Sequence, residues 1–95
     1  MMCKLLLMSG EVVSTTYPEL GDTRLSLGHF FYIAVTSLGV AAHEISLVIG
    51  RSSSEPIRAE SAGRKFFALA ATQDAIAEHG EIEIYVIRVN TRNED

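Results

Sequence analysis

Three segments of this chain carry apolar side chains on both of the faces that a β-strand would present. The segments are 4–8, 30–38 and 81–89. A sheet with one face in water alternates apolar and polar residues, and these segments do not. In 81–89, for example, Ile84 and Val86 would point to one side, and Tyr85 and Ile87 to the other. A fold of this chain must therefore cover both faces of its sheet or leave an apolar face for a partner.

The chain is too short for more than one domain. It has 95 residues, of which 47% are hydrophobic, so we expect one folded domain over 1–95 that ends in a polar tail at 90–95. Twelve acidic and eight basic residues give an acidic protein of net charge −4, which argues against binding nucleic acid by charge. Cys3 is the one cysteine, so an internal disulfide framework and an all-thiolate zinc site are excluded.

The sequence predicts a cytoplasmic protein with no membrane span. The apolar run at the N-terminus stops at 9–11, before the small-residue cleavage site that a secretory signal needs. A longer apolar stretch, 29–50, contains Glu44. An ionised glutamate inside a membrane span costs about 2.5–3.5 kcal/mol on insertion scales.

Six stretches favour strands by their β-branched, aromatic or alternating apolar residues. They cover 3–8, 11–17, 30–38, 43–50, 56–59 and 81–89. Pro56 has no N–H to donate to a sheet, so we expect the strand that starts there to lie at an edge. One amphipathic helix is expected over 62–79, between Ser61 as N-cap and Gly80 as the C-terminal stop. Its mostly apolar face comprises positions 62, 66, 69, 70, 73, 76 and 77.

These elements predict an α+β fold. It has a mostly antiparallel sheet of four to five strands, with the helix over 62–79 packed on one face. Residues 10–28 are expected to form a loop or a segment that covers part of the sheet. The stretch 39–49 also fits a helix, and the alternative is then a ferredoxin-like fold with a second helix at 39–49.

One helix can cover only one face of such a sheet, because eighteen residues of helix are about 27 Å long and about 10 Å wide. The other face is therefore either covered within the chain, by 10–28 or by a sheet that curls into a partial barrel, or it is an interface. The interface would be with another protein or with a second copy of the chain. The candidate partner-binding residues are Phe31, Ile33, Val35, Tyr85, Ile87 and Val89.

The sequence shows no catalytic or metal-binding motif, and we expect no cofactor. His29, His43 and His79 stand at no metal-ligand spacing such as HxxxH. Cys3 lies in an apolar stretch with no neighbouring histidine, which favours a buried, unreactive thiol.

Residues 56–89 run as strand, serine cap, alanine-rich helix, glycine and strand. This pattern resembles that of many small phage and mobile-element proteins, including some anti-CRISPR inhibitors. The resemblance implies a viral inhibitor, and no functional residue is transferred from it. The first hypothesis is therefore a non-enzymatic protein-binding module, either an inhibitor or a subunit of a larger assembly, which docks through an apolar sheet face or a strand edge.

The alternative hypothesis is a small oligomeric enzyme or ligand-binding domain whose site lies at a subunit boundary. Its site would draw on His43, Glu44, Arg58 or Tyr85. No nucleophile and base stand together in the sequence to support it.

Overall fold

The computed structural model describes residues 2–17, 26–50, 55–63, 72–73, 76–77 and 80–89. The elements in chain order are β1 (Cys3–Leu7), β2 (Val12–Thr16), α1 (Leu27–Leu38), the 3-10 helix η1 (Ala42–Glu44), β3 (Ile45–Ile49), β4 (Ile57–Arg58), the 3-10 helix η2 (Ala59–Ser61) and β5 (Ile82–Arg88). The fold is α+β, as predicted.

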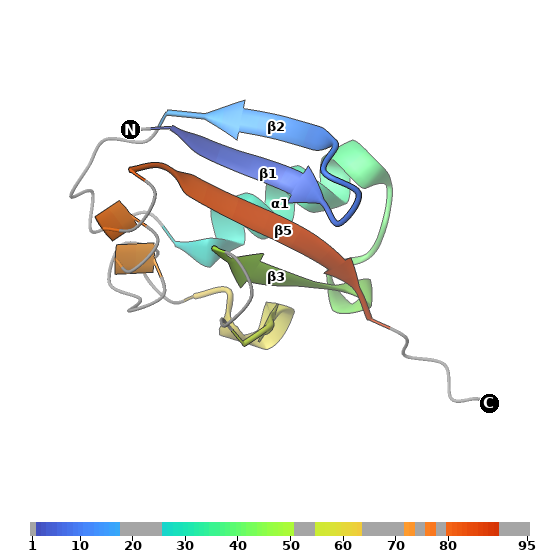
Figure 1. Ribbon diagram of the computed structural model, residues 1–95. Helices are drawn as coiled ribbons and strands as arrows, with labels where there is room; N and C mark the ends of the chain where they lie inside the picture. Colours follow the sequence, from blue (N-terminus) through green and yellow to red (C-terminus); the bar gives the residue numbers. More distant parts are fainter. Residues whose placement is uncertain are drawn as a thin grey trace.

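The strands form one mixed sheet in the order β2-β1-β5-β3-β4 (Figure 1). β5 runs parallel to β1, and the other three pairs are antiparallel. The expected sheet of four to five mostly antiparallel strands is confirmed, and the short β4 after Pro56 lies at its edge as expected. β5, the last of the described strands, occupies the middle of the sheet, so residues far apart in sequence become neighbours there.

The strand predicted over 30–38 is wrong, because these residues belong to α1. The buried residues of α1 are Leu27, Phe30, Phe31 and Ala34. Their spacing of i, i+3, i+4 and i+7 is that of one helix face. The prediction relied on the strand preference of aromatic and β-branched residues, which burial against a sheet overrides. Gly39 ends the helix at φ 69°, and its N–H donates to the Val35 carbonyl oxygen at 2.9 Å.

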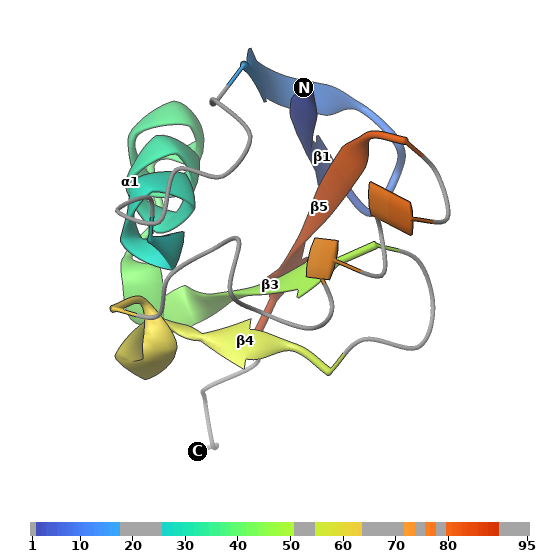
Figure 2. The same ribbon diagram turned by 90° about the vertical axis from the view of Figure 1, so that its left-hand side faces the viewer.

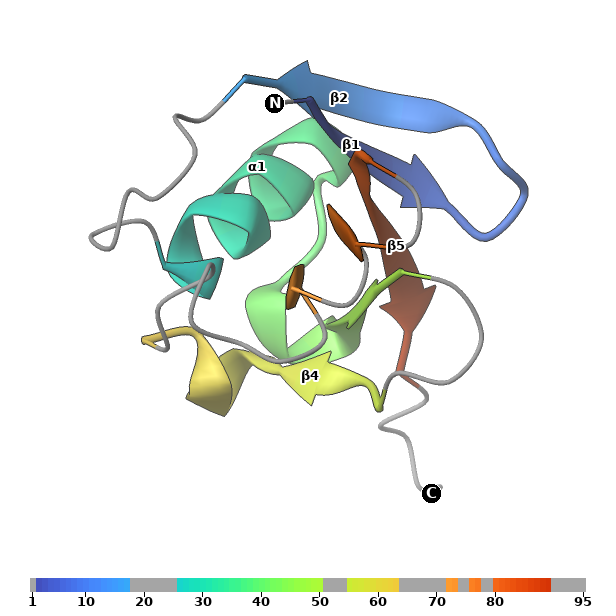
Figure 3. The same cartoon turned by 60° about the vertical axis from the view of Figure 1, so that its left-hand side comes forward.

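α1 packs on one face of the sheet, and the core lies between the two layers (Figures 2 and 3). The strands contribute Cys3, Leu5, Ile45, Leu47, Ile49, Ile82, Ile84 and Val86 to this core. They alternate along β1, β3 and β5, because successive strand side chains point to opposite faces. The residues between them therefore point away from α1.

Two other predicted elements differ from the structure. Within 39–49, helical conformation is limited to η1, and β3 occupies Ile45–Ile49, so the ferredoxin-like alternative is not confirmed. The strand expected over 43–50 is present but starts at Ile45. Residues 18–25, within the expected loop, and the expected tail at 90–95 lie outside the described residues.

Most of the helix predicted over 62–79 also lies outside the described residues. Residues 72–73 and 76–77 are described and helical. Thr72 is buried and Ile76 packs against the core, whereas Gln73 and Ala77 are exposed. Of the expected apolar face, position 76 packs against the core, whereas positions 73 and 77 are exposed, and Thr72, outside that face, is buried.

Replacing Phe30 tests the packing of α1. Phe30 is 1% exposed, so Phe30→Ala leaves a cavity under the helix and lowers the free energy of unfolding by about 3–5 kcal/mol. Urea unfolding followed by circular dichroism measures the change. Tyr32→Ala, on the exposed side of the same helix, serves as the control and changes stability by about 0.5 kcal/mol or less. Equal losses for the two variants would contradict the packing described here.

Candidate functional site

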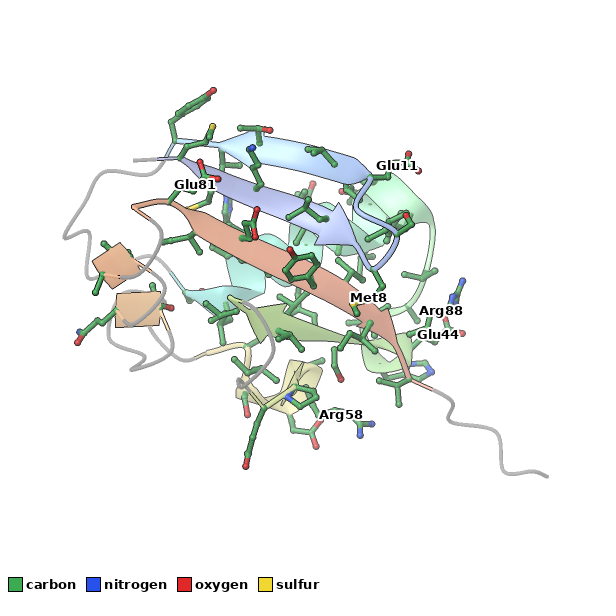
Figure 4. The ribbon with its side chains drawn as sticks, in the orientation of Figure 1. Met8, Glu11, Glu44, Arg58, Glu81 and Arg88 are labelled. Atoms are coloured by element: carbon green, nitrogen blue, oxygen red, sulfur yellow. The ribbon has the colours of Figure 1, made fainter. Side chains whose placement is uncertain are left out.

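The outer sheet face is the side of the sheet turned away from α1, and it faces the viewer in Figures 1 and 4. The register aligns Leu6, Tyr85 and Val48 across β1, β5 and β3. Val12 of β2 pairs with Leu6 and is 47% exposed. Four side chains that are apolar or aromatic therefore form one row across four strands.

A second row lies toward the C-terminal end of β5. Ile87 pairs with Ser46, and Ser46 pairs with Arg58 on β4. Met8 directly follows β1, is 66% exposed and is labelled beside the end of β5 in Figure 4. We call the apolar members of the two rows the apolar strip, which consists of Leu6, Met8, Val12, Val48, Tyr85 and Ile87. Leu6 is buried, whereas the other five are partly or largely exposed.

Glu81, Glu83 and Lys4 form an acidic corner at one end of the outer sheet face. The carboxylate Oε2 of Glu81 lies 3.9 Å from Lys4 Nζ, and each side chain is about one third exposed. The Tyr85 hydroxyl donates a hydrogen bond of 2.9 Å to Glu83 Oε1. This bond orients the Tyr85 ring, which places the aromatic member of the apolar strip beside the charged end.

Arg58 and Ser46 mark the opposite end of the outer sheet face. The side chain of Arg58 is exposed and forms no ion pair with another described residue. Ser46 is 1% exposed, and its hydroxyl has no hydrogen-bond partner among the described residues. A buried hydroxyl without a partner loses its hydration with no compensation. Figure 4 shows Arg58 and Glu81 at well-separated places on this side of the molecule.

The structure divides the predicted partner-binding residues between two layers. Phe31 is buried in the core from α1, and Ile33 and Val35, also on α1, are partly buried. Tyr85 and Ile87 lie on the outer sheet face, and Val89, just after β5, is partly buried. The predicted single surface of six residues depended on a strand over 30–38, so only its β5 members share a face.

Sequence reasoning missed four members of the apolar strip. They are Leu6, Met8, Val12 and Val48. Their strands were predicted, and the alternation within each strand was visible. Which strands are neighbours was not, because strand order depends on contacts between distant parts of the chain.

Within one copy of the chain, the residues of the alternative enzyme hypothesis lie in η1, β4 and β5. His43 is exposed in η1, and Glu44 Oε1 accepts a 3.0 Å hydrogen bond from the Ala41 N–H. Arg58 and Tyr85 lie on different strands and in different rows of the outer sheet face. Among the described residues, no three histidine, cysteine or acidic side chains are placed to hold a metal ion.

Cys3 is a buried core residue of β1. Burial raises the pKa of its thiol to about 11, because the thiolate would lose its hydration. The thiol therefore stays protonated at neutral pH, which is the opposite of what a nucleophilic cysteine requires.

No protein-family model and no curated protein matches this chain. Among the described residues, none of the helices combines the length and the apolar character that crossing a membrane requires. The inference of function therefore rests on the outer sheet face.

Replacing Ser46 tests whether its hydroxyl is unsatisfied. We expect Ser46→Ala to raise the free energy of unfolding by about 1 kcal/mol, because a desolvated hydroxyl is removed. Ser14→Ala in β2 is the matched control, since Ser14 is only partly buried, and its effect should be near zero. Urea unfolding of both variants measures the difference. A clear loss of stability in Ser46→Ala would show that the hydroxyl has a partner.

The burial and raised pKa of the Cys3 thiol predict slow chemical labelling of the folded chain and a loss of stability at high pH. At pH 8 the folded chain reacts with iodoacetamide at least about 100-fold more slowly than the urea-unfolded chain, because fewer thiolates form and the sulfur is buried. The protonated thiol stabilises the fold below pH 9, and this contribution is lost as the pH rises through about 11. This contribution is measured as the difference in unfolding free energy between the wild type and Cys3→Ala from pH 8 to 11, which should shrink as the pH rises. Rapid labelling of the folded chain would contradict the burial.

Proposed function

We propose that this chain is a small non-enzymatic protein-binding module that docks through its outer sheet face. The observation that supports the proposal is the apolar strip, which crosses four strands on the side of the sheet away from α1. Met8 and Val12 are two of the four large hydrophobic residues that are exposed in the described chain. Their gathering with Val48, Tyr85 and Ile87 on one face is typical of a protein interaction site.

The surroundings of the apolar strip also fit an interface. Protein interfaces combine an apolar, aromatic-containing centre with a polar rim that stays in contact with water. Tyr85 lies at the centre of the face, between Leu6 and Val48. Lys4, Glu81 and Arg58 provide charged groups at its ends. Tyrosine and arginine are enriched among the residues that dominate binding energy.

The sheet face is a better docking site than either strand edge. β2 carries a register shift opposite Leu5 and Leu6, and such a bulge disturbs pairing with an added strand. β4 has only two residues and follows Pro56. Bulges, prolines and short strands are the features by which proteins block pairing at an edge.

We propose that the partner is a protein, as for a cytoplasmic inhibitor of the phage or mobile-element type or a subunit of a larger assembly. The one cysteine of this acidic chain, Cys3, is buried, which argues against its use as a nucleophile. A module of this kind acts by occupying a surface of its partner.

Val48→Lys tests the proposal, because it places a charge in the middle of the apolar strip. Tagged wild type and Val48→Lys are used to capture proteins from the source cells, and captured proteins are identified by mass spectrometry. Each is then purified and titrated by calorimetry. We expect Val48→Lys to weaken binding at least about 100-fold, because a charge would be buried at the interface centre.

Tyr32→Lys is the matched control, since it changes an exposed aromatic residue of α1 to lysine on the opposite layer. It should bind as the wild type does. Circular dichroism and thermal unfolding confirm that both variants fold. Equal binding by Val48→Lys and the wild type, or equal weakening by the two lysine variants, would rule out the outer sheet face as the docking site.

A further inference from the structure

We infer that the outer sheet face binds a second copy of this chain, with the acidic corner of each copy opposite Arg58 of the other. The inference rests on the proposed function, because it names the partner of the same face. The two sheets would pack face to face with their apolar strips in contact. Sheets packed in this way lie about 10 Å apart, which brings the side chains of the two inner faces into contact.

The distribution of charge on the face favours this partner. Among the described residues, the register places Lys4, Glu81, Glu83 and Arg58 on this face, and the formal charges of these four groups cancel. Arg88 pairs with the core residue Ile45 and lies on the other side of the sheet. A neutral face suits a second copy of an acidic chain better than a strongly charged face would.

The face is also polarised in a way that matches itself. Glu81 and Glu83 lie at the start of β5, whereas Arg58 lies on β4, in the row of Ile87. A two-fold axis in the plane between the sheets, perpendicular to the line from Glu81 to Arg58, exchanges these two ends. Each Glu81 then faces the Arg58 of the other copy, and the contact occurs twice.

Other orientations of the two copies are less favourable. A two-fold axis along the line from Glu81 to Arg58 would place Glu81 opposite Glu81 and Arg58 opposite Arg58. Like charges in contact at an interface are repulsive and exclude wrong arrangements. The selected arrangement keeps Tyr85 and Val48, between the two charged ends, in the middle of the contact.

Two charge reversals test the arrangement. Sedimentation equilibrium and native mass spectrometry are run on the wild type, Glu81→Arg, Arg58→Glu and an equimolar mixture of the two variants. The wild type should form a species of twice the 10.4 kDa chain mass. Each variant alone should raise the dimer dissociation constant about tenfold to hundredfold, because two ion pairs per dimer become repulsive. The mixture should form a heterodimer with nearly the wild-type constant, because both contacts again join opposite charges.

Glu60→Arg is the matched control and should leave the constant unchanged, since Glu60 is exposed in η2, which contacts α1 on the other side of the sheet (Figure 2). Val48→Lys should abolish the dimer. A wild type that stays monomeric at about 500 µM overturns the inference, and the capture experiment with Val48→Lys then judges the proposed function separately. A dimer that persists in Val48→Lys also overturns the inference, because it would show that the two copies do not meet through the outer sheet face. A mixture that fails to recover the dimer overturns the arrangement.

Discussion

The packing of α1 on one side of the central strands is the interaction on which the rest of this structure depends. It buries alternate residues of β1, β5 and β3, together with the apolar face of the helix. Because strand side chains alternate, the same packing turns the intervening residues to the opposite side. The helix therefore determines which half of an apolar sheet is core and which half becomes the outer sheet face.

The central position of β5 determines what that outer face contains. β5 lies between the first strand of the chain and β3, so Leu6, Tyr85 and Val48 become neighbours although they are far apart in sequence. The same placement separates the acidic corner at the start of β5 from Arg58 at the sheet edge. Strand order therefore produces a face with an apolar centre and opposite charges at its two ends. This separation of charge is what allows a binding orientation to be proposed.

Local residue patterns were sufficient for most strands and misleading for the helix. The strands at 3–8, 11–17 and 81–89 were predictable because β-branched or apolar runs end at turn residues. Residues 30–38 have similar composition, yet their burial follows the helical period that starts at Leu27. Burial against a neighbouring layer decides between helix and strand in so apolar a stretch. Tyr85 and Ile87 were correctly grouped on one face, because their segment is a strand in which alternate side chains share a side. Phe31 was assigned to the same surface and lies in the core, because its segment is a helix.

The sequence by itself determined that the chain is acidic and of the α+β class, with strands at 4–8 and 81–89 that carry apolar residues on both faces. Those properties follow from composition and from the alternation of side chains along each strand. Only the tertiary structure decided which strands are adjacent, which face α1 covers and which apolar residues remain outside. These choices depend on contacts between segments distant in the chain, and a local pattern is compatible with either face of a sheet until one of them is packed.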